Sequence, residues 1–304
     1  MQKFYPIAFK GGKFVAFEEA NVSIATKALH YGTGVFGGMR VVPNPEVENE
    51  VILFRLDRHA RRLAGSASFL QFKIDEQYIA KTLIQFVREN RITQSAYLRP
   101  FICTTGLGIS PKLHDEEFDF LIYGLELGDY LKPGGVKCRF SSWVRQEDRS
   151  FPLRGKITGA YITSSLAKTE AHSSGFDESI LLNTQGKVSE ASAMNLFIVR
   201  DGVLITPGVD QDILEGITRA SVIELAKDYG IEVIERPIDK TELLIADEVF
   251  LTGSAAKVAP VRQIESYTLA ETNPITQKLL NLLSAITQGL EPRYERWITR
   301  ITVN

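Results

Sequence analysis

Lys156 has the surroundings expected of a chemically active residue. It lies between Gly155 and Gly159, after an apolar run at residues 136–144 that predicts a strand and before a run at residues 161–172 that predicts a helix. Glycine lets the backbone approach a ligand closely, and a lysine presented at such a junction can act as a Schiff-base nucleophile. A solvated loop lysine is the alternative, so the interpretation depends on the residues that accompany Lys156.

Three further features predict sites for an anion such as a phosphate. Arg55 stands at the end of a predicted strand, where its guanidinium can pair with a phosphate, although a surface ion pair is the alternative. Gly216, Ile217 and Thr218 open a predicted helix, which offers backbone N–H groups and the positive end of the helix dipole unless it is an ordinary helix start. Ser254 follows another predicted strand among small residues with open N–H groups.

Glu190 supplies a carboxylate on a predicted strand in an apolar neighbourhood. Such a site favours the neutral acid unless a cation holds the carboxylate ionised. A pyridinium nitrogen is such a cation, and pyridoxal 5'-phosphate (PLP) needs a partner for that nitrogen to act as an electron sink. A free lysine with a pKa of about 10.4 is neutral in about one molecule in 2,500 at pH 7, and condensation with a cofactor aldehyde removes this obstacle. The set as a whole describes one cofactor, PLP.

The length of the chain predicts two domains. A chain of 304 residues exceeds the usual size of a single core. The Gly- and Pro-containing stretch at residues 126–135 is the expected linker, between a smaller domain at residues 1–125 and a larger domain at residues 136–304. Asp57 and Thr158 are the expected N-caps of two of the helices.

Local patterns define several of these elements. They predict a hairpin at residues 4–17, a buried strand at residues 51–54, an amphipathic helix at residues 75–90 and a closing helix at residues 276–289.

Composition excludes several classes of protein. The formal net charge is −2, so neither nucleic acid nor an anionic membrane is an expected partner. Cys103 and Cys138 lack the spacing of a zinc site or a disulfide framework, which favours a reducing compartment, the cytoplasm. The four histidines show no metal-ligand pairing, and no metal is expected. No apolar run approaches the length of a transmembrane helix, and the N-terminus has no apolar signal core.

The series of motifs resembles the fold-type IV PLP enzymes, specifically the branched-chain amino acid aminotransferases. The matching segments follow the order of the family and span nearly the whole chain. They are His30-Tyr31-Gly32-Thr33 with Phe36, Phe54-Arg55-Leu56-Asp57-Arg58-His59 with Arg62-Leu63, Tyr97-Leu98-Arg99-Pro100, Lys156 with Tyr161, Ser189-Glu190-Ala191-Ser192 with Asn195-Leu196-Phe197, Gly216-Ile217-Thr218-Arg219, and Ala246-Asp247-Glu248-Val249-Phe250 with Gly253-Ser254-Ala255-Ala256.

This resemblance implies a fold and a set of residue roles. The fold would be the two-domain α/β (α+β) fold of the D-amino acid aminotransferase type. Lys156 would bind the cofactor aldehyde and shuttle the proton, Glu190 would pair with the pyridine nitrogen, and Tyr161 would bind the cofactor's 3′ oxygen. The phosphate would be held by Arg55, Gly216, Ile217, Thr218 and Ser254. The substrate would contact Tyr31, Phe36, Gly38, Tyr97, Arg99, Ile109, Tyr130, Ala255 and Ala256.

The resemblance also implies a reaction and an assembly. The reaction is transamination between leucine, isoleucine or valine and 2-oxoglutarate, with Arg99 suited to the glutamate γ-carboxylate. The family is built from dimers, and Tyr31 and Ile109 are candidates for completing the site of a partner subunit. The chain departs from the family at Gly37, where a glutamate is common, and at residues 191–193, where Gly-x-Gly is frequent. These departures concern the substrate range.

Three alternatives remain open at this point. A D-amino acid aminotransferase or an aminodeoxychorismate lyase would share the fold, although Tyr97-Leu98-Arg99 argues against both. A non-catalytic PLP carrier would have no need of Tyr31, Tyr97 and Arg99.

Overall fold

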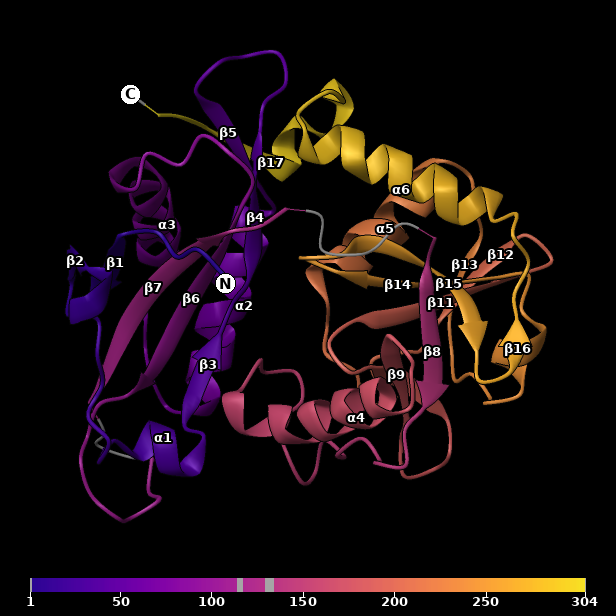
Figure 1. The fold of residues 1–304 in the computed structure, drawn as a ribbon, viewed down its shortest axis with the longest axis horizontal. Helices are drawn as coiled ribbons and strands as arrows, with labels where there is room; N and C mark the ends of the chain where they lie inside the picture. The colour runs from indigo at the N-terminus through magenta and orange to yellow at the C-terminus, as the bar shows by residue number, and fades with distance from the viewer. Residues whose placement is uncertain (1, 114–116, 129–133, 304) are drawn as a thin grey trace. The chain divides into compact units, whose positions relative to one another are not determined.

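The computed structural model describes residues 2–113, 117–128 and 134–303, and the chain divides into two compact units (Figure 1). The first unit comprises Met1–Gly128, Gly155–Gly159 and Ala285–Asn304, and the second comprises Asp129–Arg154 and Ala160–Ser284. The short segment that contains Lys156 therefore belongs to the first unit, although the chain on both sides of it belongs to the second.

An eight-stranded antiparallel sheet forms the centre of the first unit within the described residues. Its strand order is β17-β5-β4-β6-β7-β1-β2, with β3 paired to β6. The predicted N-terminal hairpin is confirmed as β1 and β2, which turn at Gly11 and Gly12, both with positive φ. The strands are β1 (Ile7–Lys10), β2 (Lys13–Ala16), β3 (Gly34–Phe36), β4 (Met39–Pro43), β5 (Glu50–Phe54), β6 (Ala96–Thr104), β7 (Phe118–Glu126) and β17 (Ile298–Thr302).

Helices α2 (Leu56–Phe69) and α3 (Glu76–Glu89) pack on each other, and they contact β3 and β1 respectively (Figure 1). The predicted amphipathic helix is α3, whose N-cap Asp75 accepts the N–H of Gln77 at 2.9 Å. Asp57 was the expected N-cap of α2, and this prediction is wrong. Arg55 takes that position in the left-handed region (φ 51°), because its N–H is bound by the carbonyl oxygen of Trp297. The unit also contains α1 (Lys27–Tyr31), η1 (Phe17–Glu19) and η4 (Pro292–Trp297).

A nine-stranded mixed sheet forms the centre of the second unit within the described residues, in the order β10-β9-β8-β15-β14-β11-β12-β13 with β16 paired to β15. Strand β8 runs parallel to β9 and β15, and β12 runs parallel to β13. The strands are β8 (Val136–Phe140), β9 (Glu178–Leu182), β10 (Val188–Ala191), β11 (Asn195–Arg200), β12 (Val203–Thr206), β13 (Val233–Glu235), β14 (Glu248–Gly253), β15 (Lys257–Ile264) and β16 (Tyr267–Thr268).

Strand β8 is shorter than the predicted run at residues 136–144. After Phe140 the chain leaves the strand, because the N–H of Ser142 donates to the carboxylate of Glu170 on the neighbouring helix. That helix, α4 (Tyr161–Ser173), packs on β9, while α5 (Ile217–Asp228) packs on β14.

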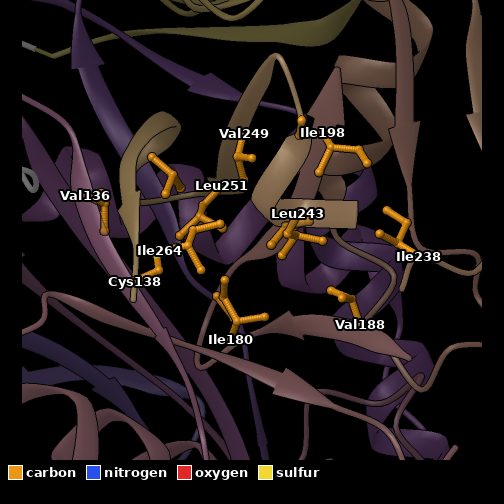
Figure 2. Close-up of a cluster of buried hydrophobic side chains, with 14 of the residues drawn as sticks. Val136, Cys138, Ile180, Val188, Ile198, Ile238, Leu243, Val249, Leu251 and Ile264 are labelled. Atoms are coloured by element: carbon orange, nitrogen blue, oxygen red, sulfur yellow. The ribbon is translucent and has the colours of Figure 1, made fainter. Parts of the chain in front are cut away.

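Buried aliphatic side chains from several strands form the core of the second unit, including Ile180, Leu251 and Ile264 (Figure 2). Each fully buried aliphatic side chain stabilises the fold by about 1.5–3 kcal/mol. The remaining elements are η2 (Thr158–Ala160), η3 (Glu242–Ile245) and α6 (Pro274–Thr287). In the described part of the chain, no helix is both long and apolar enough to cross a bilayer.

Candidate active site

The backbone of Lys156 is held on both sides within the first unit. Its N–H donates to the hydroxyl oxygen of Ser66 on α2 at 3.0 Å. Its carbonyl oxygen accepts the N–H of Phe36 on β3 at 3.0 Å, and the next residue, Ile157, forms a bridge with Val35. Strand β3 and helix α2 therefore fix the position from which the lysine side chain extends.

Glycines around Lys156 make room for protein atoms. A Cβ atom on Gly155 would lie 2.9 Å from the Phe69 ring, and one on Gly32 would lie 2.8 Å from the Cα atom of Gly159. Thr158 was the expected N-cap of α4, and this prediction is wrong. Its hydroxyl donates to the carbonyl oxygens of Gly32 and Gly34, at 2.6 Å and 3.1 Å, and α4 begins after an intervening 3-10 turn. These contacts fix the position of the lysine segment within the first unit.

Two cationic side chains share the ring of Phe36. The Lys156 Nζ atom lies 4.9 Å from the ring centroid, and the Arg99 guanidinium carbon lies 4.6 Å from it. Arg99 also lies 5.3 Å from the ring of Tyr97. A Cβ atom on Gly38 would lie 1.8 Å from the Tyr97 hydroxyl, so only glycine leaves room for that ring. The structure thus brings Phe36, Tyr97, Arg99 and Gly38 together with the lysine.

Arg55 is buried and held rigidly at the start of α2. Its guanidinium carbon lies 3.6 Å from the centre of the Trp297 ring, a cation–π stack worth about 0.5–2 kcal/mol. The left-handed backbone of Arg55 follows from its bond to the Trp297 carbonyl. A planar cation fixed in this way suits bidentate contact with a phosphate.

Tyr31 and Ile109 are adjacent to each other on the first unit. The Tyr31 hydroxyl donates to the carbonyl oxygen of Ile109. The two side chains are 40% and 92% exposed, so the Ile109 side chain packs against little of its own chain. Tyr130 lies outside the described residues.

Glu190 is the centre of a buried polar cluster in the second unit, whereas an apolar neighbourhood was expected. Its Oε1 atom lies 2.7 Å from the guanidinium of Arg145, and both side chains are less than a tenth exposed. Its Oε2 atom accepts the side-chain amide of Asn195 at 2.8 Å and the N–H of Leu214 at 3.2 Å. Arg145 is therefore a buried cationic partner of this carboxylate within the second unit.

Sequence reasoning missed Arg145, and it included Asn195 in a matching motif without giving it a role. Arg145 follows a strand and looks like a surface residue, yet its Nε atom donates to the Asp212 carbonyl oxygen at 3.1 Å. Asn195 opens β11, and its amide also donates to the Leu214 carbonyl oxygen at 2.9 Å.

The start of α5 lies beside this cluster. Gly216 is the N-cap, and a Cβ atom there would lie 1.9 Å from the Asn195 side-chain oxygen. Ile217 and Thr218 form the first turn of α5, whose leading N–H groups have no intrahelical acceptor. A helix N-terminus of this kind attracts an anion through these groups and the helix dipole.

Ser254, Ala255 and Ala256 form the turn between β14 and β15. In the register of β11 and β14, Asn195 is paired with Thr252, so the Ser254 turn lies at the same end of the sheet as Glu190's partner Asn195. Tyr161 is the first residue of α4 and is partly buried. The second unit thus gathers a carboxylate, a helix start and a small-residue turn.

Comparisons with known proteins agree with one another. The family model described as "Amino-transferase class IV" matches residues 34–264. A relative from Synechocystis sp., described as a probable branched-chain-amino-acid aminotransferase, is 58% identical over 304 residues and covers both chains in full.

Two solved structures share the fold along nearly the whole chain. The branched-chain aminotransferase of Thermoproteus uzoniensis with norvaline matches with a TM-score of 0.94 at 37% identity over 99% of each chain. The branched-chain amino acid aminotransferase of T.th., complexed with N-(5'-phosphopyridoxyl)-L-glutamate, matches with a TM-score of 0.92 at 35% identity, over 97% of this chain and 98% of that one.

Proposed function

This chain belongs to the class IV aminotransferases and, within them, to the branched-chain amino acid aminotransferases, and we propose that Lys156 is its catalytic lysine. The enzyme is PLP-dependent and transfers the amino group between branched-chain L-amino acids and 2-oxoglutarate. The predicted fold class is confirmed. The observation that carries the assignment of Lys156 is its environment, because its backbone is fixed on both sides and its side chain shares an aromatic ring with Arg99.

The residues present fit the cofactor. PLP has an anionic phosphate, and Arg55, the N–H groups of Ile217 and Thr218, and the Ser254 turn all offer the donors that a phosphate needs. The collision that a Cβ atom at Gly216 would cause supports a tightly built helix start. Glu190 offers a carboxylate for the pyridine nitrogen, and Tyr161 is assigned to the 3′ oxygen.

When bound, PLP supplies an aldehyde that condenses with amines and a ring that withdraws electrons. The chain supplies the rest. The Lys156 Nζ atom takes the proton from the substrate α-carbon and later returns it, which requires a neutral amine within hydrogen-bond reach. Glu190, which pairs with Arg145, would accept a hydrogen bond from the ring nitrogen and would favour its protonated form. Strand β3 and helix α2 keep the lysine backbone in place while its side chain moves the proton.

The substrate residues divide by chemistry. Phe36 and Tyr97 offer apolar ring surface to a branched side chain, which gains about 25 cal/mol for each Å² removed from water. Arg99, beside both rings, offers a planar cation to the γ-carboxylate of glutamate. Gly38 in the first unit and Ala255 and Ala256 in the second are assigned to substrate binding on the resemblance. Tyr31, Ile109 and Tyr130 complete the assignment.

A homodimer is also proposed, because the first unit exposes a group of apolar side chains. Ile24, Leu29, Leu107 and Ile109 are between 62% and 92% exposed. The segments that carry them are tied together, since Thr26 and Leu107 form a bridge and the Lys27 N–H donates to the Gly106 carbonyl oxygen. An apolar surface of this kind marks a protein interface, and a second copy of the chain would bury it. Light scattering that gives the mass of a single chain contradicts this.

A cytoplasmic location is proposed from the thiols. Cys103 and Cys138 are free and buried, and burial raises the pKa of Cys103 to about 12. Burial raises the pKa of Cys138 as well and so disfavours the reactive thiolate at both positions, as in a protein that needs no disulfide. Formation of an intramolecular disulfide in the protein isolated from its cells would contradict this.

The visible absorption spectrum tests the proposed function. The cofactor band of the purified protein is expected to change on addition of L-leucine and to return with 2-oxoglutarate. Lys156→Ala should lose the band and the activity, whereas Lys81→Ala, an exposed lysine on α3, should keep both. Retention of both by Lys156→Ala, or a band that D-alanine alone changes, contradicts the proposal.

A further inference from the structure

Helix α2 carries a stripe of polar side chains along one face. Arg55, His59, Arg62 and Ser66 follow one another at spacings of four, three and four, which place them on the same side of a helix. Of these, Arg55, His59 and Ser66 are each at most 7% exposed. Burial of a polar side chain costs free energy because the side chain loses its hydration, unless hydrogen bonds replace the contacts with water.

Ser66 connects this stripe to the catalytic lysine. Its hydroxyl accepts the N–H of Lys156 at 3.0 Å and donates to the carbonyl oxygen of Arg62 at 2.8 Å. Serine within a helix commonly bonds to the carbonyl four residues earlier. Here the same Ser66 oxygen also accepts the N–H of Lys156, which lies 90 residues away in the sequence. The bond to the Arg62 carbonyl orients the Ser66 hydroxyl so that its oxygen can accept the Lys156 N–H.

A second contact joins the same turn of α2 to the lysine segment. Phe69, at the end of α2, lies so close to Gly155 that a Cβ atom there would be 2.9 Å from the ring. Ser66 thus fixes the segment by a hydrogen bond, and Phe69 fixes it by close packing. Both contacts come from the end of α2 that is opposite to Arg55.

We propose that Ser66 is a positioning residue, which fixes the backbone of Lys156 to the helix that also carries the phosphate-binding Arg55. The inference rests on the roles proposed above for Lys156 and Arg55. A helix rises 1.5 Å per residue, so the backbones of Arg55 and Ser66 are separated by about 16 Å along the axis. The Arg55 side chain extends from the start of α2, and the Lys156 side chain extends from the backbone that Ser66 holds. Helix α2 therefore sets the distance between the aldehyde-binding amine and the phosphate-binding guanidinium.

His59 supports this role of the helix. It lies between Arg55 and Ser66 in the stripe, and burial lowers its pKa well below the usual value, with the charges of Arg62 and Lys156 acting in the same direction. The ring is therefore neutral, and it adds no third positive charge beside the lysine. Among the described residues, its Nδ1 atom has no hydrogen-bond partner.

Capture of the cofactor by the apoenzyme tests the inference. Apoenzyme is mixed with PLP, and the rise of the visible band gives the rate. Ser66→Ala leaves the Lys156 N–H without its acceptor, so the fraction of chains with a correctly placed lysine falls and capture should slow about five- to tenfold. The affinity for pyridoxine 5'-phosphate, which has the phosphate and ring but no aldehyde, should stay within about twofold, because it does not use the lysine.

Thr82→Val is the matched control. Thr82 is a buried residue of α3 whose hydroxyl donates to the Tyr78 carbonyl oxygen at 2.7 Å, with the same local geometry but no contact with the lysine segment. It should leave capture unchanged. Ser66→Thr keeps the hydroxyl and should restore most of the rate. Should Ser66→Ala not fold, Ser66→Cys keeps the size but weakens both bonds, and it should slow capture at least about twofold.

Three outcomes would overturn the inference. The first is a capture rate in Ser66→Ala, or in Ser66→Cys where that variant replaces it, within twofold of the wild type. The second is an equal loss of capture and of pyridoxine 5'-phosphate affinity, which indicates a general structural role. The third is normal capture by Lys156→Ala, which refutes the assigned lysine as well. When Lys156→Ala fails to capture and Ser66→Ala does not slow, only the inference on Ser66 falls.

Discussion

Replacement of Arg145 by methionine tests the buried ion pair with Glu190. The two charged atoms are 2.7 Å apart, and their side chains are 7% and 8% exposed. Methionine fills much of the same volume, but it removes the guanidinium that pairs with Glu190, while the dipolar donors Asn195 and Leu214 stay in place. Removal of one partner of a buried pair costs about 3–5 kcal/mol, because the remaining charge is buried without compensation.

Thermal unfolding of the apoprotein measures this loss. For a unit of this size, each kcal/mol lowers the melting temperature by about 2–4 °C, so Arg145→Met should lower the transition of the second unit by about 10 °C. Arg236→Met is the control, because Arg236 pairs with Glu242 but is 37% exposed. Solvent screens such a pair, and the expected loss is about 1 kcal/mol or less.

Two further measurements separate the charge effect from packing. Glu190→Gln combined with Arg145→Met removes both charges and should be more stable than Arg145→Met alone. Added PLP should raise the melting temperature of Arg145→Met by more than that of the wild type, since its ring nitrogen offers Glu190 a cationic partner. A loss in Arg145→Met as small as that in Arg236→Met, or strict additivity in the double variant, would refute the reasoning.

Two other predictions concern the first unit. Arg99→Ala should slow the half-reaction with glutamate at least about tenfold more than the half-reaction with leucine, since only glutamate loses a charge-assisted bond, and equal losses in single-turnover kinetics would contradict its role. His59 should make the protein less stable in acid, because its folded-state pKa is depressed. Below about pH 6.5 the unfolded chain binds a proton that the folded chain excludes. The free energy of unfolding therefore falls by up to about 1.4 kcal/mol per pH unit. His59→Gln should weaken the fall in melting temperature between pH 7 and 5.5. The control His172→Gln, at an exposed position of α4, should not weaken it. Identical profiles of melting temperature against pH for the two variants would disprove this.

Local patterns were sufficient wherever neighbouring residues decide the structure. The hairpin of β1 and β2 follows from apolar residues around two glycines, and α3 follows from its apolar periodicity and from Asp75 at its start. The start of α5 at Gly216 was also predicted, because a glycine before a helical run is a local signal. The helix N-caps Asp57 and Thr158 were predicted wrongly, since distant partners, the Trp297 carbonyl and the carbonyls of Gly32 and Gly34, decide those turns.

The choice among functions was decided by the order of motifs and by the relatives. The sequence left a D-amino acid aminotransferase, a lyase and a carrier as alternatives, and the relatives that match the full chain are branched-chain amino acid aminotransferases. The domain limits predicted at residues 125 and 136 and the roles assigned to individual site residues remain predictions.

The sequence by itself determined the cofactor class and the reaction, and it predicted Lys156 and Glu190 as the central residues, because these depend on residue types in a fixed order. Only the tertiary structure decided what holds them. Arg145 meets Glu190 across 45 positions of sequence, and Ser66 meets Lys156 across 90. Neither pairing leaves a periodic or compositional signal. The contacts of Arg145 and Ser66 depend on burial, and burial arises only when distant segments pack together.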